Sequence, residues 1–184
     1  GFEQSFESNA EASDAAGTVA PMRPEFAWAG PAALQIGIVV HDALQDIADT
    51  GPDNWSIDLI HDRTTLLRGE LHLLGVDEED LDRATERVIE ALCSVLDDAT
   101  GRWILQEHSE AASELPLTIH SAVGLEHVRL DRTFVDDGTR WIIDFKTSAH
   151  EGGERSAFLD SEVERYRAQL DRYADAMAAL DDRP

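Results

Sequence analysis

Residues 124–148 of the chain read GLEHVRLDRTFVDDGTRWIIDFKTS, two strand-like runs joined by Asp137-Gly138. An Asp-Gly pair between β-forming runs is the strongest short-range signal of a tight hairpin, because both residues tolerate the positive φ angles of a two-residue turn. Asp136 then pairs with Thr139, and counting back equally along both strands places Asp131 directly opposite Asp144. The stretch therefore predicts a hairpin with two facing carboxylates.

Asp131, Asp144 and Lys146 are expected on one face of this hairpin, because side chains alternate along a strand. Directly opposed side chains have Cβ atoms about 4.5–5.5 Å apart. Two carboxylates this close repel each other, and a divalent cation between them removes the repulsion. Oxygen ligands favour Mg²⁺ or Mn²⁺, and an ammonium group nearby can stabilise charge on a phosphate. The alternative is a pair of ordinary charges on the wet face of a hairpin.

The rest of the sequence fits one domain of mixed α and β structure. A chain of 184 residues with 42% hydrophobic residues is long enough to bury its own core. Apolar residues at helical spacing predict helices over 32–49, 56–74, 78–99 and 156–181, and a short extended segment over 114–120 precedes the hairpin. This order of helices, small sheet and covering helix predicts an α+β or α/β fold.

Capping and turn residues set the expected boundaries of these elements. Ser56 is a candidate N-cap, and Gly75 and Gly101 are expected to follow the ends of the second and third helices. Pro116 predicts an edge position for its strand, because proline cannot donate to a central ladder. Residues 1–30 are rich in Ser, Ala, Glu and Gly and show no period, so we interpret them as a linker or arm before a domain at 31–184.

The charge of the chain is strongly negative. Asp and Glu number 38 against 15 Lys and Arg, a formal net charge of −23, and Lys146 is the only lysine. Such a charge disfavours a surface that holds nucleic acid or an anionic membrane by bulk charge. Two interpretations stay open: adaptation to a salty cytoplasm, or a domain that leaves the holding of its substrate to a partner.

Cysteine content and apolar runs exclude several classes of protein. The single cysteine, Cys93, excludes an internal disulfide and any four-thiolate zinc or iron–sulfur site. No window approaches the run of about 18 apolar residues that a membrane-spanning helix requires.

The first residues lack the pattern of a signal peptide, so we expect a cytoplasmic location. Because the chain begins with Gly rather than Met, we also expect it to be a piece of a longer protein.

The hairpin resembles the signature of the PD-(D/E)XK nucleases, with Asp131 in RLDRTF and Asp144-x-Lys146 in WIIDFKTS. More narrowly, it is similar to the RecB-type nuclease domain at the C-terminus of UvrD/Rep-family helicase–nucleases such as RecB and AddA. IGIVVHDALQ resembles the G-x-x-x-H-x-x-L helix of that family. ELPLT resembles its short strand before the hairpin, and YRAQLDRYA its Q-x-x-x-Y motif. These matches occur in the family's order over most of the chain.

The resemblance implies a restriction-endonuclease-like core, a small central mixed sheet flanked by helices, with an N-terminal helical part. It also implies roles for residues of this chain. The implied metal ligands are His41, Asp131, Asp144 and the backbone carbonyl of Phe145, with Lys146 as the catalytic lysine and Gln169 and Tyr173 as residues that brace the site or contact the DNA backbone. The other six histidines show no ligand spacing.

Two of these residues have a structural alternative, and a further residue, Glu114, has two interpretations. A histidine beside an apolar stripe, as His41 is, is more often a core residue than a ligand. Tyr173 lies on the hydrophobic stripe of its helix, so a core role is expected in any case. We interpret Glu114 as an ordinary charge on an edge strand, with support of the metal site as the alternative.

The function implied by the resemblance is that of a Mg²⁺-dependent exonuclease domain that hydrolyses DNA phosphodiester bonds, with Mn²⁺ as a possible substitute. The implied partners are single-stranded DNA ends, the helicase motor of a parent protein and a second helicase–nuclease subunit, in double-strand-break repair and recombination. The chain has no G-x-x-x-x-G-K-[ST] motif, so it carries no motor itself. The iron–sulfur cluster of some relatives is excluded by the single cysteine. The alternative function is a catalytically inactive docking or DNA-binding module.

Overall fold

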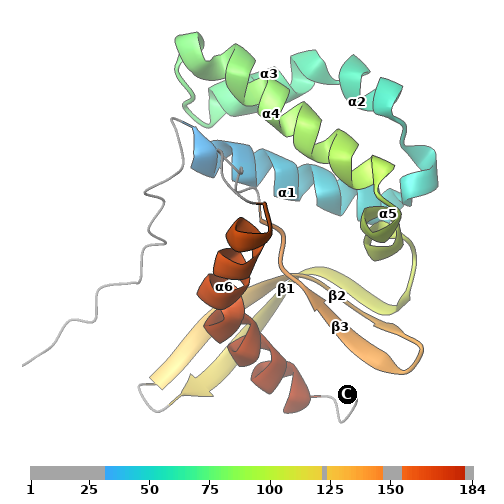
Figure 1. Cartoon of the computed structure of the whole chain (residues 1–184), viewed down its shortest axis with the longest axis vertical. Helices are drawn as coiled ribbons and strands as arrows, with labels where there is room; N and C mark the ends of the chain where they lie inside the picture. The colour runs from blue at the N-terminus through green and yellow to red at the C-terminus, as the bar shows by residue number, and fades with distance from the viewer. Residues whose placement is uncertain (1–31, 122–123, 147–154, 181–184) are drawn as a thin grey trace, which may run out of the picture.

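A computed structural model describes residues 32–121, 124–146 and 155–180 of the chain. A layer of helices lies above a three-stranded sheet, and a long C-terminal helix crosses the sheet (Figure 1). The predicted mixed α and β fold is confirmed. The predicted linker at 1–30 lies outside the described residues.

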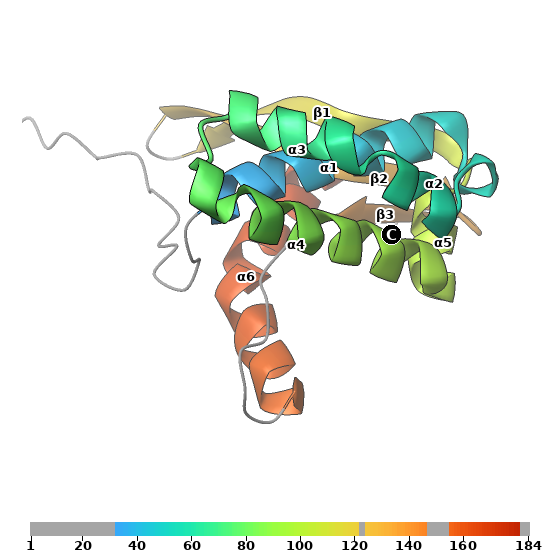
Figure 2. The same ribbon diagram turned by 90° about the horizontal axis from the view of Figure 1, so that it is seen from above.

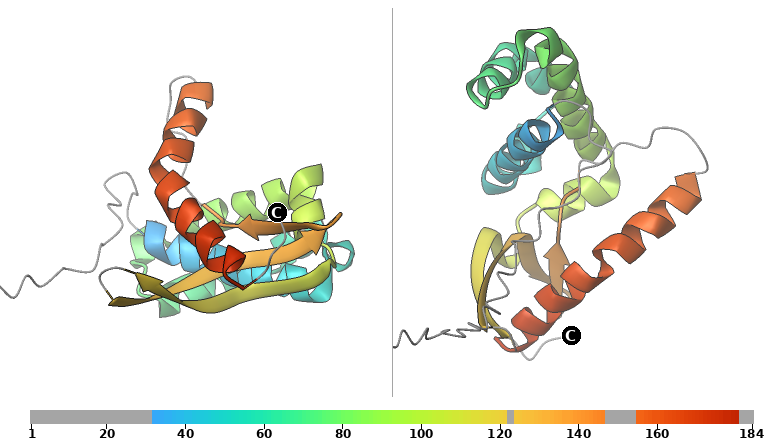
Figure 3. Two further views of the ribbon diagram at one scale, coloured as in Figure 1. Left: turned by 90° about the horizontal axis from the view of Figure 1, so that it is seen from below. Right: turned by 90° about the vertical axis from the view of Figure 1, so that its left-hand side faces the viewer.

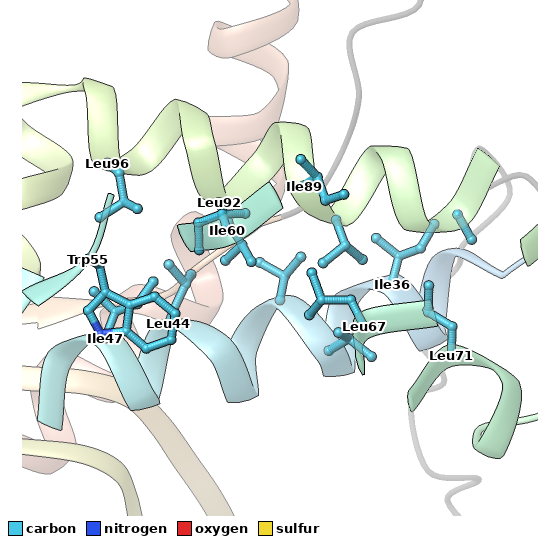
Figure 4. Close-up of a cluster of buried hydrophobic side chains, with 14 of the residues drawn as sticks. Ile36, Leu44, Ile47, Trp55, Ile60, Leu67, Leu71, Ile89, Leu92 and Leu96 are labelled. Carbon is cyan, nitrogen blue, oxygen red and sulfur yellow. The ribbon is translucent and has the colours of Figure 1, made fainter. Parts of the chain in front are cut away.

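The helical layer is held together by one apolar core. Its elements are α1 (Ala33–Thr50), the short 3-10 helix η1 (Pro52–Asn54), α2 (Ile57–Asp62), α3 (Thr64–Leu73), α4 (Glu78–Asp97) and α5 (Ala99–Leu105). Leu44 and Ile47 of α1 lie on the side of Leu92 and Leu96 of α4, and Ile36 lies at the other end of the cluster beside Leu67 and Leu71 of α3 (Figure 4). Burying such aliphatic side chains stabilises the fold by about 1.5–3 kcal/mol each.

Two helix boundaries differ from the sequence-based prediction. The helix predicted over 56–74 is two helices that meet at Arg63, where the Thr64 hydroxyl donates to the His61 carbonyl at 2.5 Å. Such local side-chain bonds compete with the helical ladder, and the apolar stripe continues across the break, so periodicity misses it. The predicted N-cap is confirmed, since Ser56 Oγ accepts from the Leu59 N–H. Gly75 follows α3 with a φ of 87°.

The prediction that Gly101 ends the third helix is wrong. Asp98 ends α4 and caps α5, and its carboxylate accepts from the Gly101 N–H at 2.8 Å. A Cβ atom at position 101 would lie 2.3 Å from the Val95 carbonyl oxygen. Glycine is therefore required here by the close approach of two helices and not as a helix terminator.

The sheet is an antiparallel meander in the order β1-β2-β3 (Ser109–Ser121, Gly124–Asp136 and Thr139–Ile143). The register of the hairpin is confirmed: Asp136 pairs with Thr139, and the ladder continues to Arg132 opposite Ile143. Asp137 and Gly138 both have positive φ, as a tight two-residue turn requires. The described strands contain no parallel pair, so the implied mixed sheet is corrected to an antiparallel one. Pro116 lies on the edge strand β1, as predicted.

Helix α6 (Arg155–Ala178) crosses the sheet with its C-terminal half, and its N-terminal half projects away from the body (Figures 2 and 3). Tyr173 and Met177 are buried against Leu130 of β2. Val163, Leu170 and Leu180, on the same predicted stripe, are exposed, so among the described residues of the stripe only Tyr173 and Met177 are core. No helix in the described ranges is both long and apolar enough to span a bilayer.

A buried arginine links the sheet to the helical layer. Arg132 of β2 is only 3% exposed and donates to the carbonyls of Ile104 and Gln106 and to the Ser113 hydroxyl. Burial lowers the pKa of its guanidinium, and the negative charge of Asp49 opposes this shift. The three acceptors would lose their partner if this side chain were removed.

We expect Arg132→Met to lower the free energy of unfolding by about 3 kcal/mol, because buried acceptors without a donor are costly. Urea denaturation followed by circular dichroism measures this loss. Arg83→Met is the matched control, since Arg83 is 64% exposed and pairs only within its own helix. Equal, small losses in the two variants would show that Arg132 does not join the two layers.

Candidate active site

Four segments that are distant in the sequence meet beside the β2–β3 hairpin. Helix α1 contributes His41, β2 contributes Asp131, the residues after β3 contribute Asp144 to Lys146, and α6 contributes Gln169. The register of the hairpin places Asp131 and Asp144 opposite each other, one step beyond the last ladder pair. All of the residues proposed from the sequence are therefore in one region.

The backbone of Phe145 connects His41 and Asp131. The Phe145 N–H donates to Asp131 Oδ2 at 2.7 Å, and the Phe145 carbonyl lies 3.1 Å from His41 Nε2. When His41 Nε2 carries the proton and donates to this carbonyl, Nδ1 presents a lone pair 3.8 Å from Asp131 Oδ2. Two acceptors that face each other in this way suit a cation between them.

A third acidic side chain completes a group that fits a metal ion. His41, Glu114 and Asp131 each offer one ligand atom, and these atoms lie within 4.8 Å of one another. One imidazole nitrogen and two carboxylates form an oxygen-rich set, which favours hard cations such as Mg²⁺ or Mn²⁺. The donor set of this cluster therefore fits a divalent metal.

Glu114 reaches this cluster through an irregular backbone. Its φ is 51°, in the left-handed region that non-glycine residues rarely adopt. Ser113 pairs with Arg132 and Leu115 with Leu130, so the same register places Glu114 opposite Asp131. Strain of this kind costs about 1–3 kcal/mol and concentrates at functional sites. β1 contains two residues of positive φ, Glu110 and Glu114, and the second of them lies where the carboxylates meet.

Asp144 belongs to a second group of contacts on the α6 side. Its carboxylate forms an ion pair with Lys146 and accepts from Gln169 Nε2 at 3.2 Å. Gln169 also donates to the Tyr173 hydroxyl at 2.7 Å, and Tyr173 is buried. These two hydrogen bonds connect Tyr173 through Gln169 to Asp144, and the bracing role of the two residues stays a prediction. Asp144 is not one of the three residues whose ligand atoms cluster.

Tyr166 of α6 is a contact that the sequence did not single out. The Lys146 ammonium lies 4.5 Å from the centroid of the Tyr166 ring. A cation over an aromatic face at this distance is attracted by the ring quadrupole. Tyr166 precedes Gln169 by one turn of α6, so the same helix contacts both members of the Asp144–Lys146 pair.

The electrostatic environment of Asp131 disfavours its charged form. Burial raises the pKa of this carboxyl above its ordinary value, and the negative charge of Asp144 adds to the shift. His41, the Phe145 N–H and Lys146 act in the opposite direction. The side chains around Asp131 therefore do not supply enough positive charge to offset its burial.

Sequence reasoning missed the place of Glu114 and of Tyr166. The sequence favours an edge-strand charge for Glu114, with support of the metal site as the alternative, and in the structure its carboxylate lies beside His41 and Asp131. The register of β1 with β2 is the signal that could have found it, because Glu114 lies between two residues whose partners flank Asp131. Tyr166 lies on the apolar stripe of α6, so the sequence predicts a core residue there and not a contact with Lys146.

Comparison with known proteins gives one family. The family model described as the PD-(D/E)XK nuclease superfamily matches residues 21–184, nearly the whole chain. Neither the curated proteins nor the solved structures gave a significant match. The match covers His41, the hairpin and the motif of α6 together.

We expect Asp131→Asn to be more stable than the original protein in the presence of a chelator. An acid with a raised native pKa binds more protons folded than unfolded, so its contribution to stability falls as the pH rises above the unfolded value near 3.8. The advantage of the variant should appear above that pH and level off above the raised native pKa. Urea denaturation between pH 4 and pH 8 measures it.

Asp171→Asn is the control for this experiment, because Asp171 is an exposed aspartate on α6. It removes one negative charge from the acidic surface without touching the cluster. A stability gain of the same size in both variants would assign the effect to net charge and would contradict the account of Asp131.

Proposed function

Since the chain belongs to the PD-(D/E)XK nuclease superfamily, we propose that it is a metal-dependent DNA nuclease that acts as an exonuclease on single-stranded ends. The observation that carries this proposal is the cluster of His41, Glu114 and Asp131 beside the Asp144–Lys146 pair. The cluster supplies metal ligands, and the pair supplies a third carboxylate and the only lysine of the chain.

The residues that would hold the metal are His41 through Nδ1, together with the carboxylates of Glu114 and Asp131. Asp144 and the Phe145 carbonyl remain predicted ligands from the sequence. In the structure this carbonyl is in hydrogen-bond contact with His41, so it also orients the ring. A bound Mg²⁺ or Mn²⁺ would lower the pKa of its water and neutralise charge on the scissile phosphate.

Lys146 would stabilise the negative charge that develops on the phosphate during hydrolysis. Its ammonium lies between the Asp144 carboxylate and the Tyr166 ring. These two contacts limit the directions that a long, flexible side chain can take. Such a preorganised cation stabilises a transition state without the cost of reorganising solvent. Gln169 and Tyr173 act through Asp144 and are positioning residues.

The wider context of the activity rests on the RecB-type resemblance. We propose that the domain works beside a helicase motor, and a second helicase–nuclease subunit, in the processing of double-strand breaks. The net charge of −23 supports this division of labour, since a motor that delivers the strand relieves the domain of binding DNA by bulk charge. The same charge favours the second candidate function, an inactive docking or DNA-binding module.

Cleavage of labelled single-stranded DNA tests the proposal. With Mg²⁺ or Mn²⁺ we expect progressive shortening from an end, and none in EDTA. Lys146→Ala should lower the rate at least ~100-fold, as loss of one transition-state donor does elsewhere. Arg83→Ala, a change of a remote exposed cation, should leave the rate unchanged. Cleavage by Lys146→Ala at the original rate would contradict the assigned mechanism, and binding without any cleavage would support the docking module.

Tyr166 gives a sharper test of how Lys146 is positioned. Tyr166→Phe keeps the aromatic face and should retain kcat, whereas Tyr166→Leu should lower kcat roughly tenfold, in line with the usual strength of a cation–π contact. KM should stay the same in both variants. Equal losses in the two variants would assign the role to the Tyr166 hydroxyl and not to its ring.

A further inference from the structure

The outer half of the β1–β2 hairpin has two unlike faces. Leu115 and Leu117 of β1, with Val128 and Leu130 of β2, pack with Tyr173 of α6. The residues between them point to the opposite side, because side chains alternate along a strand. Pro116, Thr118, His127 and Arg129 are all exposed, and we refer to these four residues as the open hairpin face.

The composition of this face is unusual for the chain. Pro116 pairs with Arg129, and Thr118 pairs with His127, so the four residues form one patch across two strands. None of the four carries a carboxylate, although the chain has 38 acidic residues. The same residues line a groove of about 450 Å³, to which Leu117 and Val128 also contribute. The groove is therefore lined without carboxylates, and its one guanidinium, that of Arg129, pairs with Glu114 at the edge of the groove.

The open hairpin face is continuous with the candidate active site. Arg129 donates to Glu114 Oε2 at 3.0 Å, and Glu114 belongs to the metal-binding cluster. Asp131 follows Arg129 by two residues on the same strand face, and His127 precedes it by two. Each step of two residues advances about 6.7 Å. The Arg129 guanidinium and the His127 imidazole thus lie at successive two-residue steps from Asp131 along β2.

We propose that the open hairpin face is the track on which a single DNA strand lies as it leaves or enters the active site. This proposal rests on the nuclease function and adds the path of the substrate. Arg129 binds a phosphate next to the scissile one through its guanidinium. Phosphate contacts of this kind position a strand without reading its sequence.

His127 supplies the next contact. Its Nδ1 lies 3.0 Å from the Thr118 hydroxyl, and a hydroxyl that donates to Nδ1 leaves the proton of the neutral ring on Nε2. Nε2–H is then a donor for a second phosphate. Leu125 lies two residues further along the same face and is 67% exposed, an apolar surface for a nucleobase. Along β2 the track therefore offers a charged group, a polar donor and an apolar contact in turn, from Arg129, His127 and Leu125.

Fluorescence anisotropy with labelled poly(dT), in Ca²⁺ and at several salt concentrations, tests the track in the full chain. We expect Arg129→Gln and His127→Gln each to weaken binding, with the larger effect, about tenfold, for the arginine. Each lost phosphate contact should reduce the slope of log K against log salt by about 0.7. Arg83→Gln is the matched control and should change neither quantity.

Cleavage and metal binding separate this proposal from the nuclease function. Single-strand cleavage by the original protein, with unchanged KM and salt slope in both track variants, would overturn the track and leave the nuclease standing. Binding of poly(dT) without cleavage would overturn the nuclease function. The binding constants of the two track variants would then still show whether DNA lies on the open hairpin face. Loss of Mn²⁺ binding in Arg129→Gln, with no effect of His127→Gln on DNA, would make Arg129 a support of Glu114 and overturn the track. Absence of both binding and cleavage would overturn both.

Discussion

The peptide group of Phe145 is the constraint on which the candidate site depends. Its N–H donates to Asp131, and its carbonyl is in contact with His41, so one residue joins the sheet to helix α1. The Phe145 side chain packs against the helical core. Its ring meets the His41 ring edge-on, with 6.0 Å between the two ring centroids. The backbone that carries Asp144 and Lys146 on either side is thereby fixed between the two layers of the fold.

The candidate site contains two features that lower the stability of the fold. Asp131 is held where burial raises its pKa, and Glu114 occupies a left-handed backbone conformation inside a strand. Both features lower the stability of the fold, and both bring carboxylate oxygens together beside a histidine. Active sites commonly retain such costs, because the residues that bind a cation repel one another without it. The buried Leu, Ile and Val side chains of the helical layer compensate for them.

The sequence was most informative where local rules act alone. The Asp137-Gly138 turn fixed the register, and the register placed Asp131 opposite Asp144. It was least informative where tertiary contacts determine the structure. Examples are the break at Arg63, the additional helix α5 that Asp98 caps, and Glu114, whose place depends on the pairing of β1 with β2. Propensity and periodicity carry no information on such pairings, because they describe one segment at a time.

Calorimetric titration with Mn²⁺ tests most directly the claim that His41, Glu114 and Asp131 form one metal site. The protein should show a single defined binding event that Glu114→Gln weakens and His41→Ala abolishes, while His72→Ala, which removes an exposed histidine of α3, leaves it intact. Weak, diffuse binding that none of these substitutions changes would mean that the acidic surface merely collects cations. That result would contradict the account of the site.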